Sequence, residues 1–172
     1  MRYVRIDSLH SGDYKSCTAN GTGFRVVCWC GGCDINCKGC HNNEYWGFNI
    51  GTELQDSDIE FMLKELELDM YEGITLIGGE PTAPQNVRGM ISIAKAVKDK
   101  FGDSRTVWTY SGRTLDVLLK NSDSKELLDY TDVLVDGPFI EKDRNIALKF
   151  RGSGNQVIWE KENGQFAKSK LN

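Results

Sequence analysis

The sequence has no apolar run that approaches the ~20 residues needed to cross a membrane. Residues 1–5 also lack the apolar stretch of a signal peptide. The formal net charge is only −4, so bulk electrostatics gives no indication of a nucleic-acid partner. A length of 172 residues suits one hydrophobic core. We therefore expect a cytoplasmic protein with a single domain over residues 1–172, its core at about 20–158 and the loop 8–23 and the tail 160–172 at the periphery.

Disulfides are not expected either, because the cytosol keeps thiols reduced. The chain nevertheless has six cysteines, five of them between Cys28 and Cys40. Such crowding in a cytosolic chain indicates metal binding or redox chemistry. Cys28 and Cys30 share one face of a short apolar stretch, which favours a role as small buried hydrophobes. Cys17, in a polar loop, is expected to be incidental.

Short apolar runs alternate with helical periodicities along most of the chain. The runs predict strands at residues 24–29, 73–77, 105–110, 131–135 and 157–159. Between them, apolar residues recur at i, i+3 and i+4, and predict helices after a capping box at residues 57–60 and after Pro84. The helical positions are Ile59, Met62, Leu63 and Leu66, then Val87, Met90, Ile91 and Ala94, then Leu115, Leu118 and Leu119, and finally Leu127 and Leu128. Asn163-Gly164 predicts a turn.

This alternation predicts an α/β fold built from parallel β-α-β units. Four or five units are too few to close an eight-stranded barrel of ~250 residues, so we expect an open sheet or a partial (β/α) barrel, mostly parallel. In such folds the working residues lie at the C-terminal ends of the strands. Here those ends carry the cysteine-rich stretch and three glycine-bearing stretches, Gly78-Gly79-Glu80, Tyr110-Ser111-Gly112 and Asp136-Gly137-Pro138.

Cys33, Cys37 and Cys40 have the spacing C-x3-C-x2-C. Gaps this short allow one loop to wrap a corner of a cubane cluster, whose usual ligands are thiolates. Three protein ligands leave one iron of four open, and an open metal position is where a substrate can bind. Glycines at both ends of the loop permit the tight backbone angles that such a wrap requires.

A zinc site is the competing interpretation of these cysteines. Structural zinc takes four ligands, usually from two separated pairs, whereas only Cys37 and Cys40 form a C-x2-C pair here. His41 could supply a fourth ligand, but its position next to Cys40 strains a tetrahedral geometry.

The cysteine spacing, followed by a strand that ends in Gly-Gly-Glu-Pro, resembles the radical S-adenosylmethionine superfamily. The closer resemblance is to the anaerobic ribonucleoside-triphosphate reductase activating proteins, because several blocks occur in family order. They are residues 20–27 (NGTGFRVV), 32–42 with Glu44 and Trp46, 75–81 (TLIGGEP), 107–112 (VWTYSG), 133–139 (VLVDGPF) and 151–156 (RGSGNQ). Thr22, Cys30, Asn43 and the long loop at residues 8–19 depart from the family pattern, but none of them touches the three presumed ligands.

The resemblance implies a partial (β/α) barrel, a [4Fe–4S] cluster and S-adenosylmethionine as cofactors, and reductive cleavage of the latter. The radical formed would take a hydrogen from a glycine near the C-terminus of the anaerobic ribonucleoside-triphosphate reductase large subunit. A flavodoxin-type protein would supply the electron. The residues that the resemblance assigns are Cys33, Cys37 and Cys40 to the cluster, Gly78, Gly79 and Glu80 to the methionine amine, and Gly39, Cys40 and His41 to the adenine.

No side chain need act as an acid, base or nucleophile in this chemistry, because the cofactor carries the hard step. Tyr110, Ser111 and Asp136 lie at strand ends near the expected site, and Asp136 is equally well explained as a turn residue. Gly78-Gly79 could also be a plain turn. Two functional alternatives stay open: a radical enzyme for another glycyl-radical enzyme or a small molecule, and a non-catalytic zinc- or cluster-binding interaction module.

Overall fold

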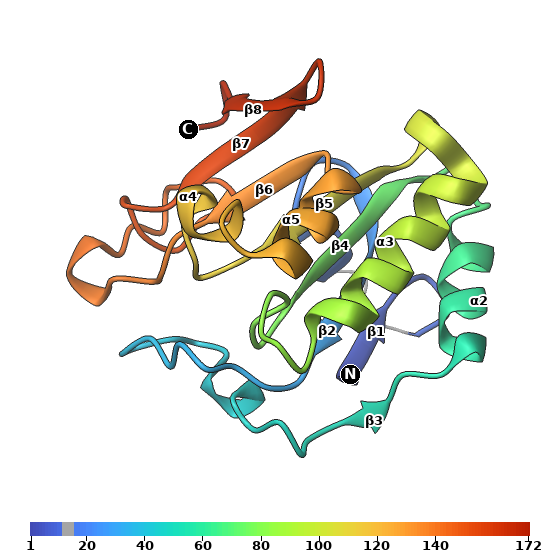
Figure 1. Ribbon diagram of the computed structural model, residues 1–172, viewed down its shortest axis with the longest axis horizontal. Coiled ribbons are helices and arrows are strands. Elements are labelled where there is room, and N and C mark those ends of the chain that lie inside the picture. Colours follow the sequence, from blue (N-terminus) through green and yellow to red (C-terminus); the bar gives the residue numbers. More distant parts are fainter. Residues whose placement is uncertain (12–15) are drawn as a thin grey trace.

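The computed structural model describes residues 1–11 and 16–172, and within them eight strands form one sheet (Figure 1). The order across the sheet is β3-β1-β2-β4-β5-β6-β7-β8, so β3 and β8 are its edges and the sheet is not a closed barrel. The strands are β1 (Arg2–Asp7), β2 (Phe24–Cys30), β3 (Thr52–Glu53), β4 (Tyr71–Gly78), β5 (Thr106–Tyr110), β6 (Val133–Asp136), β7 (Val157–Glu162) and β8 (Gln165–Lys168).

The centre of the sheet is parallel and its margins are antiparallel. β2, β4, β5 and β6 pair in parallel, whereas β1 and β3 on one side and β7 and β8 on the other join antiparallel. The predicted α/β class and the four central strands are therefore confirmed, with small shifts of their ends. The sequence patterns did not predict β1, β3 or β8.

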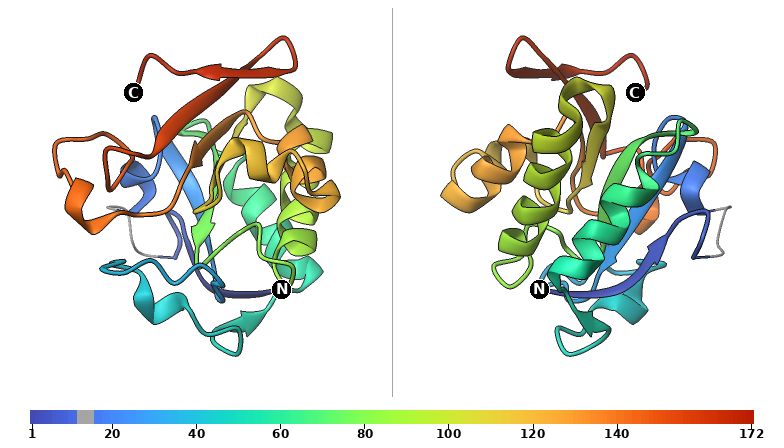
Figure 2. Two further views of the ribbon diagram at one scale, coloured as in Figure 1. Left: turned by 60° about the vertical axis from the view of Figure 1, so that its left-hand side comes forward. Right: turned by 90° about the vertical axis from the view of Figure 1, so that its right-hand side faces the viewer.

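The helices that follow the parallel strands pack on one face of the sheet (Figure 2). They are α2 (Asp56–Glu65), α3 (Val87–Phe101), α4 (Leu115–Leu118) and α5 (Ser122–Asp129). Three short 3-10 turns, η1 (Asn43–Tyr45), η2 (Gly102–Ser104) and η3 (Glu141–Asp143), lie in connections. The predicted apolar positions of α3 and α5 are buried against the sheet, whereas Leu119 follows the end of α4 and is exposed.

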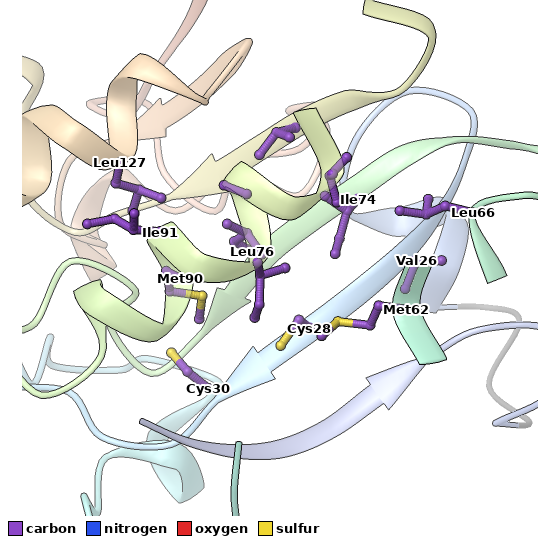
Figure 3. Packing of buried hydrophobic residues seen from close by; sticks show 14 of the residues in the cluster. Val26, Cys28, Cys30, Met62, Leu66, Ile74, Leu76, Met90, Ile91 and Leu127 are labelled. Atoms are coloured by element: carbon purple, nitrogen blue, oxygen red, sulfur yellow. The ribbon is translucent and has the colours of Figure 1, made fainter. Parts of the chain in front are cut away.

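The core beneath the helices contains the two cysteines of β2 (Figure 3). Cys28 and Cys30 are fully buried and share one cluster with Met62 of α2 and Met90 of α3. Their predicted role as small buried hydrophobes is confirmed. Cys17, in the short helix α1 (Ser16–Ala19), is also fully buried.

Two helix starts differ from the predictions. The reciprocal capping contact of α2 is not at residues 57–60, because the Asp58 carboxylate accepts from the backbone N–H of Gln55 at 2.8 Å and starts the helix earlier. Pro84 does not begin α3 either. The backbone N–H groups of Asn86 and Val87 both donate to Ala83 O, so a turn precedes the helix.

The opposite face of the sheet has no helix from α2 to α5, and a buried arginine organises it. Arg25 is fully buried, and its guanidinium donates to Thr75 Oγ1 at 2.8 Å and to the backbone oxygens of Ile74 and Thr106, each at 2.8 Å. It also stacks on the Trp108 ring, 5.4 Å from the centroid. One side chain on β2 thus joins this strand to β4 and β5.

The segments at both ends of the chain complete the sheet. β7 and β8 form a hairpin whose turn is the predicted Asn163-Gly164, with φ values of 50° and 80°. In the predicted loop at residues 8–23, residues 12–15 lie outside the described part, and Ser16–Ala19 are helical. Among the helices that the structure describes, none is both long and apolar enough to pass through a membrane.

Candidate functional site

A cavity of about 400 Å³ opens at the carboxyl ends of β2, β4, β5 and β6. It lies between the cysteine-rich loop and a long connection at residues 137–156, which we call the arm. Tyr110 and Ser111 line it, as the strand-end argument predicted. Most of the other predicted site residues also line it, namely Cys33, Cys37, Cys40, His41, Gly78, Gly79 and Glu80.

Two predicted positions lie outside the lining. Gly39 faces the arm instead, because a Cβ added there would lie 3.1 Å from the Glu141 carboxyl group. Asp136 is buried, and its Oδ2 accepts from the backbone N–H of Leu115 at 2.6 Å. Asp136 therefore fixes the start of α4, and this contact accounts for it without a ligand.

The cysteine loop owes its path to glycine and to backbone bonds with the segment that follows it. Gly32 N–H donates to Tyr45 O at 2.8 Å, and Cys33 N–H donates to Trp46 O at 3.0 Å. Gly32 has φ 92°, and a Cβ there would lie 2.1 Å from the Phe48 ring. A side chain at this position would be strained and would clash with Phe48, so the loop begins with a backbone conformation that favours glycine.

Backbone N–H groups donate to the sulfurs of Cys33 and Cys37, although burial is the larger influence and raises the pKa of both thiols overall. Burial raises the pKa of Cys33, while backbone hydrogen bonds from Asn36 and Ile35 lower it. Burial likewise raises the pKa of Cys37, against a backbone hydrogen bond from Phe139 of the arm. Amide donors to ligand sulfurs are a feature by which proteins tune iron–sulfur clusters. The donor set therefore fits a cluster.

The described residues contain no group of three or more His, Cys, Asp or Glu side chains placed to hold one metal ion. In a cubane cluster each thiolate binds a different iron, so the three cysteines need not converge on one point.

The segment after β4 runs beside the start of the cysteine loop. Gly79 N–H donates to Cys30 O, and Glu80 N–H donates to Gly32 O, each at 2.8 Å. A Cβ on Gly79 would lie 2.2 Å from Gly32 O. Glycine is thus required for close approach between two backbone segments at the cavity, which is more than a simple turn would need.

The Glu80 carboxylate is buried, with 1% of the residue exposed, and protein donors fix it. Oε1 accepts from Thr82 N–H at 2.9 Å, from the Thr82 hydroxyl at 2.5 Å and from the Ser111 hydroxyl at 2.8 Å. Oε2 accepts from Gly112 N–H at 2.8 Å, and Arg113 Nη1 lies 3.6 Å from Oε1. The carboxylate thus ties the end of β4 to the end of β5 at this wall of the cavity.

Comparison with known proteins places this chain in a family. The model of a 4Fe-4S single cluster domain matches residues 19–159. The anaerobic ribonucleoside-triphosphate reductase-activating protein of Haemophilus influenzae is 35% identical over 147 residues, which cover 84% of this chain and 93% of that protein. The protein of the same name from Enterobacteria phage T4 is 33% identical over 166 residues, which cover 95% and 97%.

The chain belongs to the family of anaerobic ribonucleoside-triphosphate reductase-activating proteins. A further relative of that name, from Vibrio cholerae, is 35% identical over 148 residues, 84% of this chain and 93% of that protein. The family resemblance predicted from the sequence is thereby confirmed. The prediction of an iron–sulfur protein is confirmed as well.

The RGSGNQ stretch closes the base of the arm. Gln156 Nε2 donates to Gly137 O at 3.0 Å, while its Oε1 accepts from Gly152 N–H at 2.8 Å. Asn155 Nδ2 donates to Pro138 O at 2.8 Å. These bonds hold Phe139, at the start of the arm, beside Cys37. The two late blocks of the family pattern thus meet in space to build the second wall of the cavity.

Sequence reasoning missed two features of the site. Trp29, on β2, lines the cavity. Asn86 is 1% exposed. It contacts the cysteine loop although more than fifty residues separate the two in the sequence. The Asn-Val pair at the start of a helical periodicity gave no hint of the Asn86 contact, because it depends on how β2 and β4 pair.

Proposed function

We propose that this chain activates the anaerobic ribonucleoside-triphosphate reductase by reductive cleavage of S-adenosylmethionine at a [4Fe–4S] cluster, followed by hydrogen abstraction from a glycine of the reductase. The observation that carries the proposal is one shared cavity. Its lining includes the three cysteines of the loop and Gly78-Gly79-Glu80 on the adjacent strand end. A volume of about 400 Å³ is within the range of small-molecule sites.

Cys33, Cys37 and Cys40 would hold the cluster and leave one iron open. When bound, the reduced cluster supplies the electron that breaks the C5′–S bond of S-adenosylmethionine, which yields methionine and the 5′-deoxyadenosyl radical. The protein's part is to bind, to orient and to exclude water.

The wall made by Gly78, Gly79 and Glu80 would receive the methionine amine. An ammonium group needs acceptors, and this wall offers backbone carbonyls beside a fixed carboxylate. Gly39, Cys40 and His41, at the outer end of the loop, would contact the adenine. Of these, Cys40 and His41 line the cavity.

The proposal also assigns the fold to the radical S-adenosylmethionine type of partial (β/α) barrel. Its support is the parallel centre of the sheet, the helices on one face and the cavity at the carboxyl ends of the strands. The sheet leaves an open side, through which a glycine-bearing loop of the reductase could enter. A flavodoxin-type protein in the cytoplasm would supply the electron.

The test is anaerobic reconstitution with iron and sulfide, reduction, addition of S-adenosylmethionine, and an assay for 5′-deoxyadenosine. We expect the product from the loaded protein. No product from fully loaded, reduced protein would refute the radical chemistry and favour a non-catalytic cluster module. Stoichiometric zinc without iron would favour the zinc module.

The partner is tested separately. Addition of the anaerobic reductase should produce a glycyl signal in electron paramagnetic resonance. If 5′-deoxyadenosine forms but the reductase gives no such signal, the substrate is another glycyl-radical enzyme or a small molecule.

A further inference from the structure

Asn86 stands immediately before α3 but does not cap it. A helix N-cap asparagine usually accepts a hydrogen bond from a backbone N–H of the first turn. Asn121, before α5, does so, because its Oδ1 accepts from Ser124 N–H at 2.9 Å. Asn86 makes no such bond, although it occupies the same position relative to its helix. Its side chain therefore has another use.

The Asn86 amide is shared by three backbone carbonyls. Nδ2 lies 3.0 Å from Gly31 O, 3.1 Å from Gly32 O and 3.0 Å from Glu80 O. It is also 3.6 Å from the Cys30 sulfur. Two of these carbonyls start the cysteine loop, and the third belongs to the segment that follows Gly79.

The arrangement depends on a donor with two hydrogens. Three carbonyl oxygens that converge in a buried space repel one another, because each carries the negative end of a peptide dipole. The partly positive hydrogens of the Asn86 amide offset this repulsion. Gly32 O also accepts from Glu80 N–H at 2.8 Å, and Glu80 O accepts from Ala83 N–H at 3.1 Å. Gly31 O is therefore the carbonyl that depends most on Asn86. A buried acceptor that loses its donor is costly. Asn86 is 1% exposed, so water does not replace it easily.

The backbone of Asn86 is itself fixed. Its N–H donates to Ala83 O at 2.8 Å, and Met90 N–H donates to its carbonyl at 3.1 Å. The amide thus comes from the residue immediately before a 15-residue helix whose apolar side is buried in the core.

We propose that Asn86 is a positioning residue that holds the start of the cysteine loop against Gly79-Glu80, and so sets the spacing between the cluster's open iron and the segment that receives the methionine amine. The inference rests on the proposed function for its ligands, since the two joined segments are the two halves of that site. Asn86 itself touches neither the cavity nor the cofactor. Its effect is exerted through Gly32, next to the ligand Cys33, and through Glu80.

The test compares Asn86→Ala with Asn121→Ala, the same substitution at the same helix position. The first readout is hydrogen–deuterium exchange of the cluster-free protein. Asn86→Ala should accelerate exchange in peptides that contain Gly32 and Glu80, whereas Asn121→Ala should accelerate it only near α5. Equal protection of Gly32 and Glu80 in wild type and Asn86→Ala would overturn the inference, whatever the cofactor.

The second readout is the affinity of the reconstituted protein for S-adenosylmethionine, measured by calorimetry. The electron paramagnetic resonance spectrum of the reduced cluster is recorded alongside it. Loss of a residue that supports a metal ligand from outside typically lowers metal affinity or activity by about 10- to 100-fold. We expect Asn86→Ala to load iron but to raise the dissociation constant by about tenfold or more and to weaken the spectral change on cofactor binding. Asn121→Ala should match wild type in both. Wild-type affinity in a loaded Asn86→Ala protein would refute the inference, whereas a wild-type protein that binds no cluster would refute the proposed function instead.

Discussion

The indole N–H of Trp29 donates to the Asp7 carboxylate at 2.7 Å. The bond joins β1 to β2, because Asp7 is the last residue of one strand and Trp29 lies near the end of the other. Arg5 contacts both side chains. Its Nε lies 3.2 Å from Asp7 Oδ1. Its guanidinium lies 4.6 Å from the Trp29 ring centroid. The neighbouring strand β1 thus fixes the orientation of an aromatic ring that lines the cavity.

Replacement of this buried carboxylate should destabilise the protein. Asp7→Ala leaves the buried indole N–H without its acceptor, which costs about 1 to 3 kcal/mol. Urea unfolding monitored by circular dichroism measures the change. The exposed Asp69→Ala serves as the control and should lie within about 0.5 kcal/mol of wild type. Equal losses for the two variants would show that the Trp29 contact contributes nothing.

Glu80→Gln should be more damaging than its similar shape suggests. One oxygen becomes an NH2 group and must face a donor, either Gly112 N–H or the Thr82 and Ser111 hydroxyls. We expect a loss of about 2 to 3 kcal/mol in the free energy of unfolding, since the bonds are charge-assisted. Ser111→Ala removes one donor and should cost about 1 kcal/mol. If Ser111→Ala costs as much as Glu80→Gln in urea unfolding, the carboxylate is not the centre of this network.

The ligand assignment predicts opposite results for two cysteines in the same segment of chain. Cys37→Ala should lose most of the iron and sulfide after anaerobic reconstitution, because it removes one of three ligands. Cys28→Ala should retain the cluster, since Cys28 lies in the core on the helix side of β2. Iron and sulfide analysis with the absorption spectrum decides the question. Loss of the cluster in Cys28→Ala, from a protein that still folds, would contradict the assignment.

The cluster-free protein should lose stability in alkali. Burial raises the pKa of Cys28 from 9.0 to about 12, so the folded state keeps a proton that the unfolded chain releases. This contribution to stability is complete below about pH 9 and is lost as the pH rises towards about 12, at about 1.4 kcal/mol per pH unit. Burial raises the pKa of Tyr71 to about 12 and acts in the same direction.

Urea unfolding at several pH values above 9 tests this expectation. Cys28→Ala should show a shallower decline than wild type, by the share that Cys28 contributes. Identical slopes for the two proteins would contradict the buried thiol as a source of the pH dependence.

The sequence was most informative for strands that are buried on both faces of the sheet. β2, β4, β5 and β6 are continuous apolar runs, because parallel central strands are covered on both faces. β1 escaped prediction because it mixes apolar residues with charges such as Arg2 and Arg5 and therefore shows no continuous apolar run. The three cysteines and Gly78-Gly79-Glu80 could be predicted as neighbours, because strand ends of a parallel sheet meet at one edge.

What the sequence could not provide were contacts that depend on strand pairing. The Asn86 amide reaches Gly31 and Gly32 only because β4 pairs with β2 so that Gly78 lies opposite Cys30. The position of Gly39 against Glu141 likewise follows from the path of the arm, for which the sequence showed no periodicity.

The arm has a consequence for the order in which the site is assembled. During synthesis the N-terminal part of a chain emerges first, so the cysteine loop is available well before Phe139 and the stretch that fastens it at Gln156. The wall that covers Cys37 is therefore the last part of the site to be made.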